Sequence, residues 1–504
     1  MTRIILSIFV IVTLLSLIGC SQTVSGQVLQ SDKPRDTSPS VSQSDLTALV
    51  DGNNAFAFAL YQVLKQTGGN LFYSPYSISE ALAMTYAGAR GETQIDMAKA
   101  LNFTLSQDRL HPAFNSLDLQ LKQRGQGAQG KNGTPFRLDV ANAIWGQKDY
   151  QFLAQYLDVL AQNYGAGLMI VDFIKQTEQS RLTINQWVSE QTQGKIKDLI
   201  PQGGINDLTR LVLTNAIYFN ASWMYPFDDK ATVNGPFYLL DGSSVTVPMM
   251  KQTESFKYTE GADYQAVELP YSGQELSMVI MLPKAGEFEA FENSLNAELV
   301  KTIISQLEIN EVSLTMPKFE YDSSFGLTQA LSTLGMGIAF TQDADFSGMD
   351  GNHDLLIQDV LHKAFVSVDE AGTEAAAATA VIVGLTAMPQ SASCRMRGIS
   401  SSFNPGITGA TSTPTGTPAS LSACTASSRR SGRAARGSIR RASSPSRLVI
   451  DRNTCAAPSA ANALNRSASR VTSVLLVTTP TGLRNSPNTS RQRLVSCRRR
   501  SAGW

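Results

Sequence analysis

The chain has 504 residues with 42 basic and 42 acidic side chains, but its neutral balance hides two oppositely charged parts. Residues 391–504 contain 18 Arg, no Lys, no Glu and one Asp, which gives them about +17 and leaves about −17 on residues 1–390. Residues 21–390 lack cysteine, the whole chain has three His, and common hydrolase, zinc-protease and nucleotide-binding motifs are absent, so enzyme chemistry and cysteine-based metal sites are disfavoured.

The N-terminus has the pattern of a secretory leader. An apolar stretch over residues 4–18 follows Arg3, and it is too short for a confident membrane-spanning helix. It ends in the sequence LIGC, which resembles the bacterial lipobox. Residues 1–20 are therefore expected to be a lipoprotein signal peptide, with Cys20 as the lipid attachment site. An ordinary cleaved signal peptide or a weak membrane anchor is the alternative.

The next two segments differ sharply in composition. Residues 21–43 are rich in Ser, Gln and Pro, which predicts a flexible tether. Residues 44–390 are predicted to form one globular domain. A lipid-anchored domain of this kind is expected in the cell envelope or outside the cell.

Helical periodicity opens the globular domain. Phe56, Leu60, Val63 and Leu64 recur at helical spacing before a glycine pair at 68–69, which predicts an amphipathic first helix. The small-residue sequence ISEALAMTYAGA, beginning just after Ser77, predicts a second helix that packs closely inside the protein.

Apolar runs farther along the chain predict strands. They lie at 211–219, 244–250, 275–283, 312–319 and 362–368. Uninterrupted runs such as MVIML indicate sheets that are covered on both faces. The predicted fold class is therefore α+β with large central sheets.

Several motifs in this domain resemble those of the serpin family. They are NLFYSPYSISEALAMTYAGARGET at 70–93, TNAIYFNASWMYPF at 214–227, VPMM at 247–250, LGMGIAFTQDADFSGM at 334–349 and HKAFVSVDEAGTEAAAATA at 362–380. The resemblance implies a serpin fold with a large central sheet A, sheets B and C, and eight or nine helices. It also implies an inhibitor of serine proteases rather than an enzyme, with no cofactor or metal, acting as a monomer.

The resemblance further implies that a protease cuts an exposed loop, becomes covalently attached, and is trapped when the loop inserts into the main sheet. A segment that later becomes a central strand needs small side chains on alternate positions. Ala375, Ala377 and Thr379 meet this need, and Gly372 supplies backbone freedom. The hinge segment implied by the resemblance consists of Glu370, Gly372, Thr373, Glu374, Ala375, Ala376, Ala377, Ala378 and Thr379. In isolation the same run would suggest a flexible linker or an alanine-rich helix.

Family spacing implies a reactive bond between Thr386 and Ala387, with Leu385–Thr386 as the alternative. These residues suggest proteases of elastase-, chymotrypsin- or subtilisin-like specificity, with cysteine proteases as a further class. Ser74, Ser77, Asn215 and His362 match a polar cluster beneath the opening sheet, and Trp223 matches an aromatic residue where the loop inserts. Hydrogen-bonded core residues are the plain alternative for these positions.

The family's last two strands are not found after residue 390. Residues 391–504 are rich in Ser, Arg, Ala and Thr, and they are expected to be disordered. Residues 398–404, read in a shifted frame, can encode His-Leu-Phe-Phe-Ile, which suggests a frameshift between residues 390 and 397. The fold would then have its last strands missing or scrambled, and the chain as written would be inactive or non-inhibitory. A nucleic-acid-binding tail is the rival interpretation, but the arginines are scattered and no stacking aromatic residues accompany them, so no nucleic-acid partner is expected.

Overall fold

The computed structural model describes residues 28–29, 33–386 and 476–477, and this part of the chain has the expected α+β architecture. Its ten α-helices exceed the eight or nine expected because two of them, α10 and α11, are single turns of four residues. The helices are α2 (Gln43–Leu64), α3 (Pro75–Tyr86), α4 (Gly91–Ala100), α5 (Gln107–Lys122), α6 (Ala154–Tyr164), α7 (Thr177–Gln191), α8 (Phe288–Ser294), α9 (Ala297–Ser305), α10 (Thr328–Leu331) and α11 (Ser347–Asp350).

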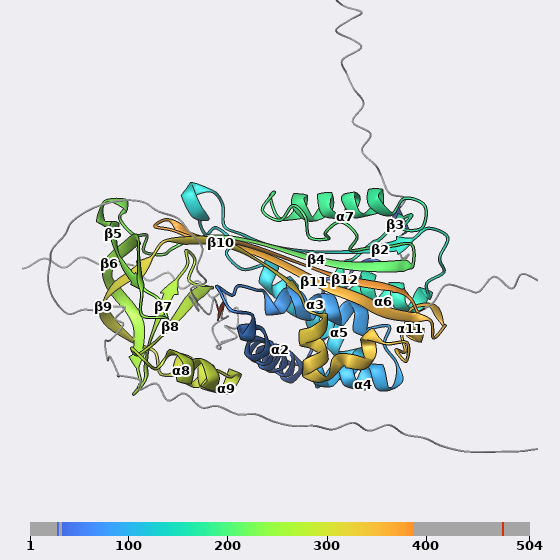
Figure 1. Cartoon of the computed structure of the whole chain (residues 1–504), viewed down its shortest axis with the longest axis horizontal. Coiled ribbons are helices and arrows are strands. Elements are labelled where there is room, and N and C mark those ends of the chain that lie inside the picture. Colours follow the sequence, from blue (N-terminus) through green and yellow to red (C-terminus); the bar gives the residue numbers. More distant parts are fainter. Residues whose placement is uncertain (1–27, 30–32, 387–475, 478–504) are drawn as a thin grey trace, which may run out of the picture. The chain divides into compact units, whose positions relative to one another are not determined.

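The strands form two sheets (Figure 1). The first has seven strands in the order β1-β3-β2-β4-β12-β11-β10 and corresponds to sheet A. The two smaller sheets implied by the resemblance form one six-stranded sheet, since β6 pairs with β5, β7 and β9. The strands are β1 (Val28–Leu29), β2 (Arg137–Gln147), β3 (Leu168–Val171), β4 (Thr209–Ser222), β5 (Val233–Tyr238), β6 (Ser244–Glu260), β7 (Tyr264–Pro270), β8 (Ser277–Pro283), β9 (Glu308–Pro317), β10 (Phe319–Gly326), β11 (Leu355–Val368), β12 (Gly372–Leu385) and β13 (Leu476–Val477).

The expected elements are present, with shifted boundaries. The first helix ends at Leu64, and the glycines at 68 and 69 both take φ of +73°, a conformation that favours glycine. The second helix begins at Pro75 rather than after Ser77, because the Ser74 side chain caps it by accepting from the Ser77 backbone N–H at 3.2 Å. The run at 312–319 spans two strands, β9 and β10, that are separated at Lys318.

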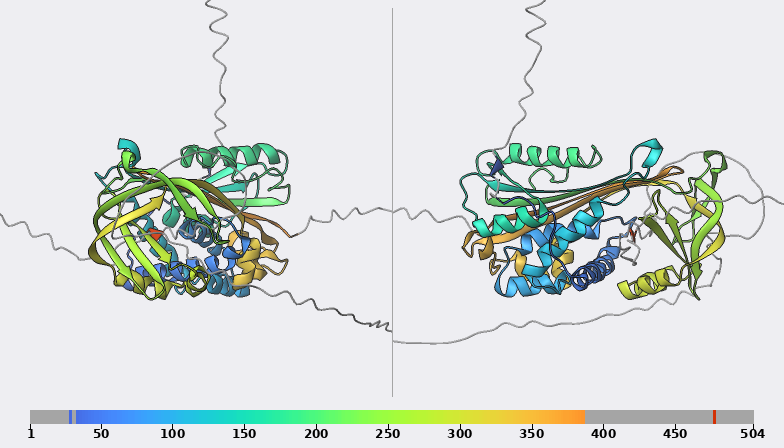
Figure 2. Two further views of the ribbon diagram at one scale, coloured as in Figure 1. Left: turned by 60° about the vertical axis from the view of Figure 1, so that its left-hand side comes forward. Right: turned by 180° about the vertical axis from the view of Figure 1, so that it is seen from behind.

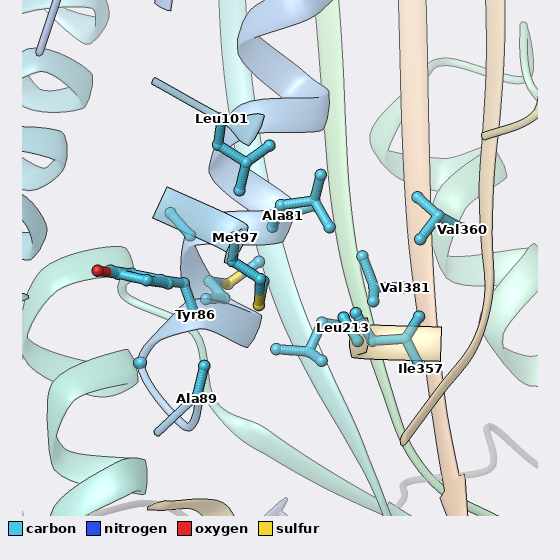
Figure 3. Packing of buried hydrophobic residues seen from close by; sticks show 14 of the residues in the cluster. Ala81, Tyr86, Ala89, Met97, Leu101, Leu213, Ile357, Val360 and Val381 are labelled. Carbon is cyan, nitrogen blue, oxygen red and sulfur yellow. The ribbon is translucent and has the colours of Figure 1, made fainter. Parts of the chain in front are cut away.

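Helices cover both faces of the seven-stranded sheet (Figure 2). On one face, Ile184 and Val188 of α7 pack on the sheet, and α3 packs on the other face. Figure 3 shows the second contact, where Ala81 of α3 lies near Leu213 of β4 and Val381 of β12. This double cover explains the uninterrupted apolar runs of the central strands.

The segment just before the first helix makes defined contacts, which the expectation of a flexible tether over residues 21–43 did not foresee. Arg35 forms an ion pair with the buried carboxylate of Asp118 and donates to the side-chain oxygen of Asn115 at 2.9 Å. Lys33 pairs with Asp158 at 2.8 Å. Residues 33–36 therefore dock on α5 and α6.

The expectations for residues 391–504 fall outside the described residues, except at β13. There the backbone of Leu476 and Val477 pairs antiparallel with Val279 and Met278 of β8. The described pairing covers two of the seven positions on this edge of β8.

Candidate functional site

The alanine-rich segment forms β12, an interior strand of the seven-stranded sheet between β4 and β11 (Figure 1). It runs antiparallel to both neighbours, so that Ala377 lies opposite Ile217 of β4 and Ala364 of β11. Alternate residues face opposite sides: Ala375 and Ala377 pack toward the six-stranded sheet, and the intervening alanines pack under α7. Small side chains suit the strand because both of its faces are covered.

The sequence-based expectation has this segment waiting in solvent until a protease cuts it, whereas the structure holds it inserted in an uncut chain. Insertion buries every side chain from Ala375 to Val383. It also gives the backbone hydrogen-bond partners on both sides, in β4 and in β11. Apolar burial and complete backbone pairing thus both favour the inserted arrangement.

Gly372 stands where the strand begins, and the inserted strand gives this glycine a second role beside the expected hinge freedom. Its φ there is not positive, so the inserted conformation itself suits other residues. However, a Cβ atom there would lie 2.1 Å from the backbone oxygen of Ala221 on β4. A side chain at this position would hold the two strands apart.

Two stacked aromatic residues form hydrogen bonds at the beginning of β12. Trp223 stacks on Tyr271 with ring centroids 4.8 Å apart and an interplanar angle of 9°. The indole N–H donates to the carbonyl of Asp369 at 2.9 Å, and the Tyr271 hydroxyl donates to Oγ1 of the fully buried Thr373 at 2.9 Å. Trp223 was expected at this position from the resemblance, whereas Tyr271 was missed because an isolated tyrosine carries no motif.

Both acidic residues of the hinge segment have cationic partners. Glu370 pairs with Lys318 at 2.8 Å and accepts from Thr232 at 2.8 Å. Burial raises the pKa of Glu370, but its hydrogen bonds with Lys318, the backbone and Thr232 outweigh this effect and hold the pKa below its ordinary value. Glu374 pairs with Lys195 at 2.9 Å, so neither carboxylate opposes the inserted strand as an unpaired charge.

The four polar residues expected from the sequence meet in one hydrogen-bonded chain, completed by Thr379 of β12. The Ser74 backbone N–H donates to Nε2 of His362 at 3.1 Å, so the imidazole proton lies on Nδ1, which donates to Thr379 Oγ1 at 2.8 Å. Thr379 lies 3.1 Å from the Ser77 hydroxyl, which in turn donates to Asn215. Burial lowers the pKa of His362 to about 3, which keeps the ring neutral.

The hydrogen-bonded chain extends from Asn215 to Glu80 and Asn142, two residues that the sequence analysis did not single out. Asn215 Nδ2 donates to Glu80 Oε2 at 2.8 Å and to Asn142 Oδ1 at 3.0 Å. Glu80 is buried on α3, where a single acid inside the apolar run ISEALAM was the one available signal. Burial, followed by the charge of Asp118, raises the pKa of Glu80 to about 8, although Asn142 and the cations Lys122 and Arg35 oppose this shift.

This raised pKa predicts a pH-dependent stability. Below about pH 4.5 the Glu80 carboxyl is protonated in both the folded and the unfolded protein. Between about pH 4.5 and 8 this carboxyl is ionised in the unfolded protein and protonated in the folded one. The free energy of unfolding should therefore fall as the pH rises through this range. Glu80→Gln, which mimics the protonated carboxyl, should flatten the decline and raise the melting temperature at pH 8. Thermal unfolding at several pH values measures this, with the exposed Glu311→Gln as control, and an unchanged decline would contradict it.

The far end of β12 lies where the reactive bond was expected. Leu385 pairs with Leu355 of β11, and the Thr386 backbone N–H donates to the carbonyl of Asp354 at 2.8 Å. A cleft of about 390 Å³ opens beside Leu385, between Arg210 and Asp354. Ala387 lies outside the described residues.

Neither a metal site nor a membrane span emerges from the part of the chain that the structure describes. Those residues contain no cluster of three or more His, Cys, Asp or Glu arranged to hold a metal ion. None of their helices combines the length and the apolar character needed to cross a membrane. Cys20, the expected lipid attachment site, lies outside the described residues.

Comparison with known proteins identifies many relatives of this architecture. The family model described as Serpin (serine protease inhibitor) matches residues 51–396. An uncharacterized serpin-like protein of Thermococcus kodakarensis is 42% identical over 342 residues, which cover 68% of this chain and 78% of that protein. The leukocyte elastase inhibitor of Sus scrofa is 42% identical over 341 residues, or 66% of this chain and 88% of the relative.

Solved structures give the same picture. Ovalbumin from emu (Dromaius novaehollandiae) superposes with a TM-score of 0.64 at 28% identity, covering 68% of this chain and 92% of ovalbumin. Cleaved kallistatin in complex with heparin has a TM-score of 0.63 at 31% identity, and the match covers 68% of this chain and all of the kallistatin chain. Kallistatin, whose structure was solved in the cleaved form, thus has the same architecture as this chain.

Proposed function

Because this chain belongs to the serpin family of serine protease inhibitors, we propose that it inhibits serine endopeptidases by covalent trapping followed by insertion of its reactive loop. The single observation that carries the proposal is β12, a 14-residue interior strand of the seven-stranded sheet whose alanine-rich first part has small side chains on both faces. At ~3.3 Å per residue, a strand of this length moves an attached protease by roughly 45 Å.

The polar cluster supports the same proposal by its position. Thr379 of β12 supplies one link in the hydrogen-bonded chain between His362 and Ser77. Before insertion that link is absent, so the cluster must rearrange when the strand enters. We propose that Ser74, Ser77, Asn215 and His362 act as a structural latch, with no covalent role, and that Trp223 and the hinge residues guide the first step of insertion.

The target proteases are proposed from the residues at the end of the strand. Thr386–Ala387 is the proposed reactive bond and Leu385–Thr386 the alternative, and both suit elastase-, chymotrypsin- or subtilisin-like proteases, with cysteine proteases as a further class. Several relatives are named leukocyte elastase inhibitor, which supports an elastase-like target. We propose that the protein inhibits as a monomer and that it requires neither nucleic acid nor a cofactor.

A gel assay tests the inhibition. Incubation with elastase, chymotrypsin or subtilisin should yield a covalent complex that survives SDS, because the acyl bond between protease and loop is retained. An equal mixture with protease inactivated at its serine is the control, and it should give no complex. Simple cleavage near residues 385–387 would show that only the loop is recognised, and general degradation would show that the fold is not stable.

We propose a location in the cell envelope or outside the cell, with a lipid anchor at Cys20. The support is the LIGC sequence at the end of the apolar leader. Metabolic labelling with a fatty acid should mark the wild-type chain and not Cys20→Ala, and equal labelling of both chains would refute the anchor.

A second candidate is an inactive or non-inhibitory serpin-like protein, and a specific observation favours it. In the uncut chain β12 already occupies the sheet, so no exposed loop remains over residues 372–385 to be attacked. The family match also stops at residue 396, with 108 residues beyond it. We propose that a frameshift between residues 390 and 397 removed the last strands. The DNA of this region tests the idea, which fails if no shifted frame encodes a phenylalanine-rich strand.

A further inference from the structure

Both neighbours of β12 bulge near its far end, at adjacent positions on either side of Val383. On β11, Ile357 lies opposite Val383 and Asp359 lies opposite Ile382, so Gln358 is an extra residue. On β4, Leu211 lies opposite Val383 and Thr209 opposite Gly384, so Arg210 is also extra. The register of β12 from 373 to 382 is otherwise regular on both sides. Bulges re-aim side chains, and two facing bulges mark a specialised position.

At this position a side chain crosses over the strand. Thr209 Oγ1 of β4 donates to Gln358 Oε1 of β11 at 3.0 Å, so a hydrogen bond joins the two neighbours over β12. The same Thr209 hydroxyl accepts from the backbone N–H of Asn206 at 3.1 Å, which orients its proton toward Gln358. We name this hydrogen bond between Thr209 and Gln358 the clasp.

The clasp leaves room for a glycine beneath it. A Cβ atom at Gly384 would lie 2.3 Å from Nε2 and 2.4 Å from Cδ of Gln358, closer than real contacts allow. The φ of Gly384 is not positive, so its backbone conformation suits other residues. A side chain at 384 would therefore have to displace the end of the Gln358 side chain, and with it the clasp, whereas the backbone of β12 would not be strained.

We propose that Gly384 is a specificity-determining residue of the reactive loop, because it lets the clasp close over the last part of β12 when insertion is completed. The inference rests on the proposed inhibitory function. It also narrows the partner: with a reactive bond after Thr386, the target must accept glycine at the third residue before the bond. A protease that needs a large side chain at this position would cut the wild-type loop poorly. A variant that supplied the side chain would be cut well but would insert more slowly and trap the protease less.

Substitutions at the two glycines of β12, Gly372 and Gly384, are expected to respond differently to shortening of Gln358. At Gly372 the clash is with backbone atoms of β4, which no side-chain change can remove, whereas at Gly384 it is with a side chain that can be shortened. Gly384→Val also raises the intrinsic strand preference of the segment, so any loss of stability must come from contacts. Truncating Gln358 should therefore rescue Gly384→Val and should not rescue Gly372→Ala.

The experiment is a double-mutant cycle on the full chain with Gly384→Val, Gln358→Ala and their combination. Thermal unfolding is measured on the intact protein and after the loop has been cut by subtilisin. In wild-type background Gly384→Val should lower the melting temperature by several degrees, whereas in the Gln358→Ala background it should change little. Gly384→Ala replaces the valine variant if the latter does not fold, and Gly372→Ala with Gln358→Ala is the matched control without rescue.

Trapping of the protease provides the second readout. Gly384→Val should slow the last part of insertion, so the ratio of SDS-stable complex to cleaved chain should fall on the order of threefold to tenfold. Adding Gln358→Ala should restore this ratio. The inference is overturned if Gly384→Val has no effect on either melting temperature, or if its effect is equal with and without Gln358. A wild-type chain that forms no complex would refute the proposed inhibition instead, while the melting temperatures would still test the clasp.

Discussion

Thr373→Arg is expected to abolish trapping and to turn the protein into a substrate of its target protease. Thr373 is fully buried in β12, and its hydroxyl accepts from Tyr271, which stacks on Trp223. An arginine here would bury a large charged side chain where a fully buried threonine fits, at the second residue of the strand. A penalty of about 3 kcal/mol in the insertion barrier would slow insertion on the order of 100-fold. Hydrolysis of the acyl bond would then release the protease.

The measurement is the ratio of SDS-stable complex to cleaved chain on a gel, together with the melting temperature of the cleaved protein. Ala371→Arg is the matched control, because Ala371 is only half-buried and contacts its neighbours through its backbone. This control should trap normally, since the half-buried position lets an arginine side chain reach solvent. Equal complex formation by Thr373→Arg and wild type would contradict the role given to this end of the strand.

The proposed frameshift predicts that restoring the reading frame after about residue 390 produces a large gain in stability. The two strands expected from the resemblance would add on the order of ten large apolar side chains, and at ~1.5–3 kcal/mol each their gross burial amounts to roughly 15–30 kcal/mol. Ordering of the added residues offsets part of this gain. β8 is the natural partner for an added strand, because its described outer pairing covers two of its seven positions.

Chemical denaturation of the restored chain measures this effect. A chain that stops after residue 390 is the matched control, because it lacks both the restored strands and residues 391–504. The restored protein should unfold at a higher denaturant concentration than this control and should form complexes with serine proteases. If the two unfold together, the proposed strands do not contribute, and the frameshift hypothesis loses its physical support.

Local sequence patterns determined much of this protein. Helical periodicity identified α2, and apolar runs identified β4, β8 and β11, because these patterns act over a few neighbouring residues. The alternation of small side chains in the hinge segment fixed which residues share a face of β12, because side chains alternate along any strand. The resemblance implied that Ser74, Ser77, Asn215 and His362 would meet, and they do.

Tertiary structure decided the rest, because contacts between distant residues depend on sheet register. Ser77 and Thr379 are 302 positions apart, and the pairing of β12 with β4 and β11 is what brings them together. The packing of α3 on the sheet adds Glu80 to the polar cluster through Asn215 and Asn142, and the pairing of β12 with β11 sets Gln358 over Gly384. The tertiary structure also shows that Gly372 allows β12 to approach β4 closely. No local pattern carries this information, since each of these contacts joins elements that are far apart in the sequence.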